Sequence, residues 1–214
     1  MTDYLTKDVL SVIIVLCKTE MMKGGDVILK KKTVIRISTL RRDADDGLID
    51  AISEILKTVD DGLAAEDSAR DDELVREALG FLGSEDIFDD DLEEIITEGY
   101  IEIGENGCVE ISYEESEIGG LEGSRVRLVF NADSPSLVSM IREGAVSTML
   151  SFEEGKRHRS TYNTPYMPFD LVLNTSRVDN RILEEGKLTL CYVMEIRGLS
   201  VSRCRLDITV SKPT

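Results

Sequence analysis

The second half of the chain alternates apolar and polar residues with a period of two, and this pattern constrains the fold more than any other feature. It is clearest between residues 187 and 197, where every second residue is apolar: Leu188, Leu190, Tyr192, Met194 and Ile196. Successive side chains of a β-strand point to opposite faces, which produces this alternation. Strands of the same kind are predicted over residues 94–103, 109–115, 124–132, 136–142, 145–153, 157–163, 169–176 and 200–210. From residue 94 onward the chain is therefore a run of about eight or more consecutive strands.

Turn residues separate these strands at hairpin distances. Asn106-Gly107 suits the positive φ angles of a type I′ turn, and further turns are expected at Glu143-Gly144, Glu154-Gly155, Asp179-Asn180 and Glu185-Gly186. Short connections make consecutive strands antiparallel neighbours, as in a sandwich or an up-and-down barrel. We favour the barrel, because a closed meander leaves no exposed edge. Residues 30–39 add one earlier strand.

An acidic segment interrupts the pattern between residues 40 and 93. The range 40–98 holds 21 of the 42 acidic residues but only 5 of the 25 basic ones, so it carries almost all of the net charge of −17. Its apolar residues recur at helical spacing and predict amphipathic helices over 45–60 and 70–82. This acidic α-helical insertion is interpreted as a solvated face, or alternatively as a docking surface for a basic protein partner.

Several classes of protein are excluded by composition. The net negative charge argues against nucleic-acid binding, and no apolar run is long enough to span a membrane. The single His and four Cys, none of them in a C-x-x-C pair, predict no metal site, and no cofactor motif is present. The apolar run 9–17, within an extension covering 1–29, is compatible with a strand or a short helix. Without an export signal, the protein is expected to be cytoplasmic.

Four segments in order carry a family resemblance. They are ISYEES at 111–116, MIREGAVSTMLSF at 140–152, STYNTPY at 160–166 and GKLTLCYVMEI at 186–196. Together they resemble the YwiB-like bacterial family of domains of unknown function. The resemblance implies a mainly β fold, an antiparallel calycin-like (lipocalin-like) β-barrel built from 30–39 and 94–214, with 40–93 as an insertion. It implies no reaction.

The alternation also predicts polar side chains inside the barrel. Tyr113 and Glu115 share the face of Val109 and Ile111, and a buried carboxylate needs a partner, for which Arg142 is the candidate. The remaining candidate ligand-binding residues are Tyr162, Thr164, Tyr166 and Tyr192.

These residues predict a small ligand inside the barrel or at its mouth, since binding sites combine an apolar cavity with a few polar groups. The ligand is expected to be partly apolar and anionic, and the protein non-enzymatic. A buried polar network with a purely structural role stays open as an interpretation. So does a hydrolase or isomerase that uses Glu115 as acid and base.

Overall fold

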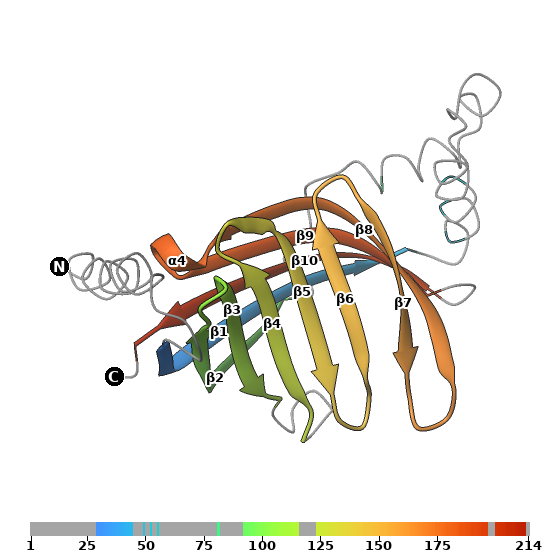
Figure 1. Ribbon diagram of the computed structural model, residues 1–214. Coiled ribbons are helices and arrows are strands. Elements are labelled where there is room, and N and C mark those ends of the chain that lie inside the picture. Colours follow the sequence, from blue (N-terminus) through green and yellow to red (C-terminus); the bar gives the residue numbers. More distant parts are fainter. Residues whose placement is uncertain are drawn as a thin grey trace.

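The computed structural model describes residues 29–44, 92–115, 123–196 and 200–212, together with the single residues Ile49, Ile52, Ile55 and Phe81. The extension before Leu29, including the run 9–17, and nearly all of the predicted helices 45–60 and 70–82 lie outside the described residues. The described chain is mainly β (Figure 1). Its strands are β1 (Leu29–Asp43), β2 (Leu92–Ile103), β3 (Cys108–Glu114), β4 (Arg125–Asn131), β5 (Ser134–Glu143), β6 (Thr148–Glu153), β7 (Arg157–Asn163), β8 (Pro168–Arg181), β9 (Lys187–Ile196) and β10 (Ser200–Ser211).

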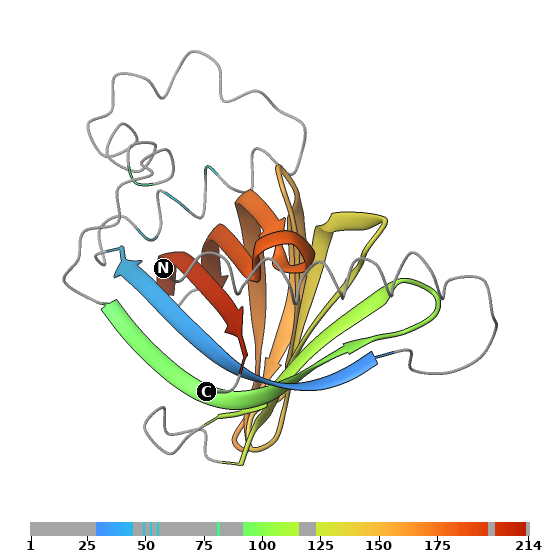
Figure 2. The same ribbon diagram turned by 90° about the vertical axis from the view of Figure 1, so that its left-hand side faces the viewer.

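The strands form one antiparallel sheet of ten strands in the order β6-β5-β4-β3-β2-β1-β10-β9-β8-β7. The sheet curls into a nearly closed barrel (Figure 2). Its first and last strands, β6 and β7, meet through an isolated bridge between Ser147 and Asn163. The Ser160 hydroxyl adds a hydrogen bond to the Met149 carbonyl at 2.5 Å. The predicted antiparallel barrel with hairpin-connected strands is therefore confirmed at this level.

The strand β1 pairs with both β2 and β10, so the first described strand lies between the second strand and the last one. It continues to Asp43, and β2 begins at Leu92, so both strands reach into the range predicted as the insertion.

The turn predicted at Asp179-Asn180 is wrong. These residues belong to β8, which continues to Arg181 after a register shift between Thr175 and Arg177. The chain reverses instead through the short helix α4 (Ile182–Glu185). At the C-terminal end of α4, Gly186 has a φ of 72°, a left-handed conformation that glycine adopts without strain.

The interior of the barrel is filled by the inward-facing apolar residues of every strand. At the end near α4, side chains such as Ile103, Val109, Leu188 and Ile208 are at most 1% exposed. On β2, a side chain at Gly99 would collide with the Ser112 carbonyl of β3, so glycine allows these two strands to approach closely. This end is a packed core, whereas the opposite end carries the polar side chains.

Four described residues of the acidic segment, Ile49, Ile52, Ile55 and Phe81, have helical backbone. Ile52 and Phe81 are buried against Val193 and Val201 on the outer face of the barrel. The guanidinium groups of Arg42 and Arg203 lie over the Phe81 ring, 5.8 and 5.7 Å from its centre. The sheet therefore offers an apolar and basic outer surface to this part of the acidic segment.

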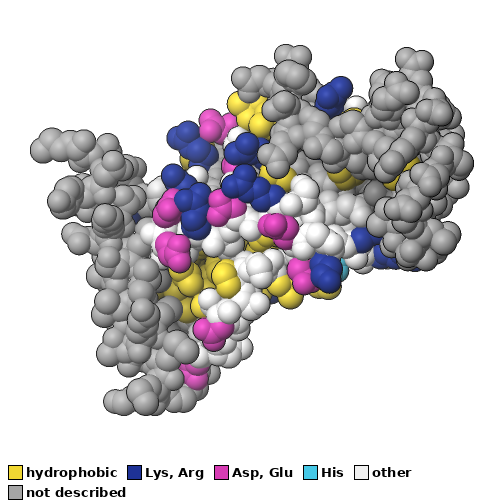
Figure 3. All heavy atoms as spheres, turned by 90° about the horizontal axis from the view of Figure 1, so that it is seen from above, with side chains coloured by type: hydrophobic (Ala, Val, Ile, Leu, Met, Phe, Trp, Pro, Cys, Tyr) yellow, Lys and Arg dark blue, Asp and Glu magenta, His cyan; other side chains and the backbone are white. Residues whose placement is uncertain are grey.

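Elsewhere the outer face carries ion pairs. On β8, Asp179 accepts hydrogen bonds from Arg177 and Arg181, and on β10 Arg205 pairs with Asp207. Figure 3 shows basic and acidic side chains interspersed on the face seen from above. Among the described residues, no helix has the length and apolar character that crossing a membrane requires.

Candidate functional site

One end of the barrel, here called the mouth, is where β1, β3, β5, β7 and β9 end and the other strands begin. A cavity of about 630 Å³ opens there. Its lining residues are Thr39, Arg41, Asp43, Leu92, Glu93, Tyr192, Met194 and Cys204. The volume lies within the range of small-molecule sites, which combine apolar walls with a few polar groups.

An ion pair between Glu115 and Arg142 lies at the same end of the barrel, and Arg142 is close enough to Tyr192, which lines the cavity, to affect the pKa of that phenol. Glu115 follows the end of β3, Arg142 lies near the end of β5, and the Arg142 Nη2 donates to Glu115 Oε1 at 2.7 Å. Their side chains are only 16% and 23% exposed. The partner predicted for Glu115 from strand alternation is therefore present.

The pair is incompletely hydrogen-bonded. Within the described chain, the buried Glu115 Oε2 and Arg142 Nε have no hydrogen-bond partner. Buried polar atoms of this kind carry a desolvation cost, which a bound molecule or water can relieve.

A second ion pair, missed by the sequence analysis, lies on β1 and lines the cavity. Arg41 Nε donates to Asp43 Oδ1 at 2.8 Å, and the Ser202 hydroxyl of β10 donates to the same oxygen at 2.5 Å. Burial alone would raise the pKa of Asp43, but the hydrogen bonds from Ser202 and Arg41 outweigh it and lower this pKa. Asp43 therefore remains charged and neutralises Arg41.

Two tyrosines line the interior between these pairs. Tyr113 is 9% exposed, and burial, reinforced by the charge of Glu115, raises its pKa. Burial likewise raises the pKa of Tyr192, whose ring packs edge-on against Phe152 with the ring centres 5.0 Å apart. Both phenols therefore act as neutral hydrogen-bonding groups and are poor proton acceptors at neutral pH.

The other predicted site residues divide into two groups. Tyr162 packs against the core cluster. Thr164 and Tyr166 belong to the β7–β8 connection, where the Thr164 hydroxyl donates to the Met167 carbonyl at 2.8 Å and Tyr166 is 96% exposed. The structure thus brings Tyr113, Glu115, Arg142 and Tyr192 together, but not Thr164 or Tyr166.

Cys204 provides a chemical probe of the mouth, because its thiol lines the cavity and is 3% exposed. Burial raises the pKa of Cys204 to about 11, although Arg41 and a hydrogen bond with Tyr192 oppose the shift. Only the thiolate is nucleophilic, so Cys204 is expected to react with iodoacetamide at pH 7.5 about 100-fold more slowly than an ordinary thiol. Mass spectrometry of timed alkylation, with the partly exposed Cys108 and Cys191 as internal comparisons, measures this rate. Alkylation of Cys204 as fast as of Cys108 would show that the thiol is accessible and that burial does not raise its pKa.

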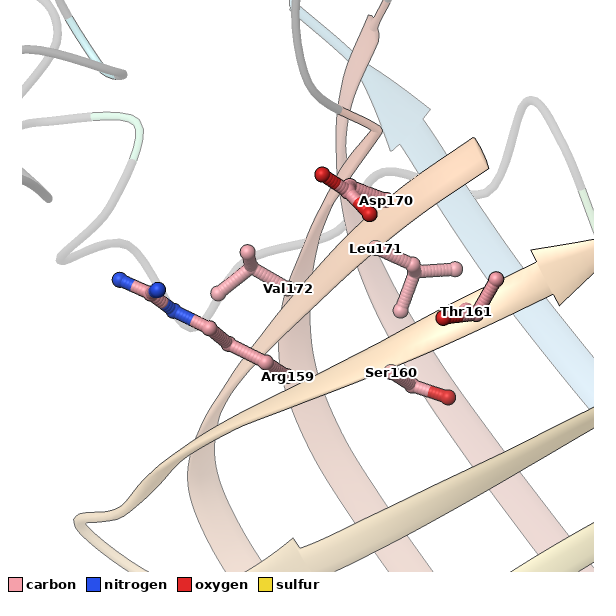
Figure 4. A pocket seen from close by; sticks show the side chains of 6 residues that line it. All are labelled: Arg159, Ser160, Thr161, Asp170, Leu171 and Val172. Carbon is pink, nitrogen blue, oxygen red and sulfur yellow. The ribbon is translucent and has the colours of Figure 1, made fainter. Parts of the chain in front are cut away.

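A smaller hollow of about 280 Å³ lies along the β7–β8 hairpin. Its lining residues pair directly in register: Arg159 with Val172, Ser160 with Leu171 and Thr161 with Asp170. Figure 4 shows Arg159 and Val172 on one side of the hairpin, with Ser160 and Leu171 turned to the other. The mouth is the stronger candidate, because its cavity is larger than this hollow and the same end of the barrel holds a buried, incompletely hydrogen-bonded ion pair.

No cluster of three or more metal-ligating side chains occurs among the residues that the structure describes.

The fold and the mouth define a class of protein, an antiparallel β-barrel with a packed end and a polar, hollow end. Residues 84–208 match the family model described as a domain of unknown function (DUF1934). The chain belongs to this family. A solved structure, the ywiB protein from Bacillus subtilis, matches with a TM-score of 0.51 and 18% identity. The match covers 86% of this chain and 96% of that chain. The predicted membership of the YwiB-like family is confirmed, and none of the curated proteins matches the chain.

Proposed function

We propose that this barrel binds one small, partly apolar molecule in its mouth, in the manner of calycin-like barrels. The observation that carries this proposal is the cavity of about 630 Å³ at the end of the barrel that also holds the buried Glu115–Arg142 pair. Tyr192, Met194 and Leu92 provide apolar walls for the body of the ligand. The two unpartnered atoms of the ion pair provide one hydrogen-bond acceptor and one donor.

The charge of the mouth indicates the class of ligand. Arg142 is neutralised by Glu115, and Arg41 by Asp43, while Glu93 adds a further negative charge to the lining. Among the described residues at the mouth, an anion would meet no unpaired arginine and would approach a surplus of carboxylate. We therefore replace the anionic ligand expected from sequence with an uncharged one that carries a hydroxyl or amide group.

The experiment is a thermal-melting screen with small neutral alcohols and amides, each paired with its matching carboxylate. A ligand present at 100 times its dissociation constant stabilises the folded state by about 2.7 kcal/mol. Stabilisation by a neutral compound, its absence with the matching acid, and its loss in Glu115→Gln would support the proposal. The control is Glu110→Gln, on the outer face of β3, where the carboxylate pairs with Arg127. If no compound shifts the melting temperature, or if Glu115→Gln leaves every shift unchanged, the mouth is not a binding site of this kind.

The other two functions expected from sequence have less support. The acidic insertion was predicted to dock a basic partner. Almost all of its residues lie outside the described part of the chain, so this function stays a prediction. Use of Glu115 as acid and base is disfavoured by its tight pairing with Arg142, because a general base must be free to exchange its proton with a substrate.

A further inference from the structure

The strand β2 has one partner along its whole length and a second along less than half of it. It pairs with β1 from Leu92 to Ile103, whereas its ladder with β3 covers only Gly99–Ile103. Residues 92–98, here called the free edge, therefore face no described strand on the side away from β1. In Figure 2, β1 follows one side of this part of β2.

Hydrogen bonds on either side of β3 show which backbone groups point to the free edge. Glu115 N donates to Ser124 O, in line with β4, and Gly104 N donates to Cys108 O, between β2 and β3. In antiparallel sheets the backbone groups of alternate residues point to opposite neighbours. The even-numbered residues of β2 therefore point to the β3 side, and their N–H and C=O groups lie along the free edge at four positions: Leu92, Glu94, Ile96 and Glu98.

The side chains of the free edge do not protect it. Leu92 and Ile96 are 51% and 58% exposed. Glu94 pairs with Arg36 at 3.2 Å and Glu98 with Lys32 at 2.7 Å, and these exposed ion pairs with β1 reduce the negative charge of the edge without cancelling it. The segment contains no Pro or Lys, the residues that usually prevent a sheet edge from pairing with another chain.

Two copies of the free edge complement each other when they pair antiparallel around Ile95, the central residue of the segment. An antiparallel copy with Ile95 opposite Ile95 places Glu94 opposite Ile96 and Leu92 opposite Glu98. All the edge-facing residues then lie in hydrogen-bonded pairs, and no acid faces another acid. Shifting the two-fold axis to Ile96 would instead place Glu94 opposite Glu98, which like charges disfavour.

We propose that two copies of this chain form a two-fold dimer by antiparallel pairing of their free edges. The dimer joins the two sheets across Ile95 and buries Leu92 and Ile96 in both copies, so its interface reaches the rim of each mouth, where Leu92 also lines the cavity. Two-fold contacts of this kind are closed and self-complementary, so they end at a dimer.

Light scattering with size-exclusion chromatography on the full chain tests the dimer. The wild-type protein is expected at twice its chain mass of 23.8 kDa. Ile96→Glu places an acid opposite Glu94 at two symmetric positions of the dimer and should weaken dimerisation by at least about tenfold. The control is Tyr100→Glu, on the same face of β2 but beyond the free edge, which should leave the dimer unchanged. A wild-type monomer at the highest attainable concentration, or a dimer equally sensitive to both substitutions, would overturn the proposal.

Disulfide crosslinking tests the register. At Ile95 the two copies would form a non-hydrogen-bonded pair with Cα atoms about 4.5 Å apart, within the range of a disulfide. Ile95→Cys should therefore crosslink on mild oxidation, above the level of the wild-type protein with its own cysteines. Ile96→Cys should not, because Ile96 faces Glu94 of the second copy. A crosslink equally strong at both positions, or absent at Ile95, would contradict this pairing.

Discussion

Phe152→Ala is expected to lower the free energy of unfolding by about 4 kcal/mol, the typical cost of removing a fully buried phenylalanine. Phe152 is 0% exposed and lies on β6, one of the two strands at which the barrel closes. Its ring packs edge-on against Tyr192 of β9, on the far side of the seam. The substitution therefore opens a void in the core and removes a contact that holds β6 against the rest of the barrel.

Urea denaturation measures this loss, with two comparisons. Phe152→Leu keeps most of the volume and should cost about 1.5 kcal/mol or less. Phe169→Ala, at a partly exposed position near the start of β8, should cost clearly less than Phe152→Ala. Equal losses for the two alanine variants would mean that the seam is not held by the Phe152 side chain.

The local pattern was sufficient to predict most of the strands, because each one buries a single face. Where apolar and polar residues alternate without interruption, as in β9, the predicted range 187–197 and the observed strand Lys187–Ile196 nearly coincide. Register follows from the same requirement, since a shift by one residue would move every apolar side chain to the solvent. This is also why the Glu115–Arg142 pair could be predicted: each residue shares the inward face of the apolar residues that alternate before it.

The second ion pair was missed because β1 becomes polar before it ends. Its inward positions continue from Thr33, Ile35 and Ile37 through Thr39 to Arg41 and Asp43. Arg41 and Asp43 were assigned to the acidic insertion by composition. The alternation of inward and outward residues continues to Asp43. Extending it beyond the last apolar residue of β1 predicts that Arg41 and Asp43 both face inward.

Strand alternation does not predict the direction of a side chain where the backbone is irregular. The register shift between Thr175 and Arg177 changes which residues of β8 face inward, so the polar end of this strand resembled a turn. Thr164 and Tyr166 lie in the connection after β7, where alternation no longer sets direction. Pairing of β1 with β10 joins residues far apart in sequence, and no local signal specifies it.

Arg142→Met is expected to destabilise the protein by about 2–3 kcal/mol, somewhat less than for a fully buried ion pair because both side chains retain some exposure. The methionine keeps much of the arginine volume, but Glu115 is left as a poorly solvated charge without its cation. Urea denaturation at neutral pH measures the effect. The matched control is Arg127→Met on the outer face, where Arg127 contacts Glu110 and Glu143 at 3.4 Å, and its cost should stay below about 1 kcal/mol.

The double variant Arg142→Met/Glu115→Gln separates charge from packing. If the unpaired carboxylate causes the loss, neutralising Glu115 should restore at least about half of the stability that Arg142→Met removes, because no buried charge remains. If the double variant instead loses as much unfolding free energy as the two single variants together, the arginine acts through the packing of its aliphatic stem. The first result would mean that the pair at the mouth acts as an electrostatic unit. The second would mean that the Glu115–Arg142 pair supplies no electrostatic unit at the mouth, and the proposed binding site would then depend on Arg41, Asp43 and Glu93 of the cavity lining for its charged groups.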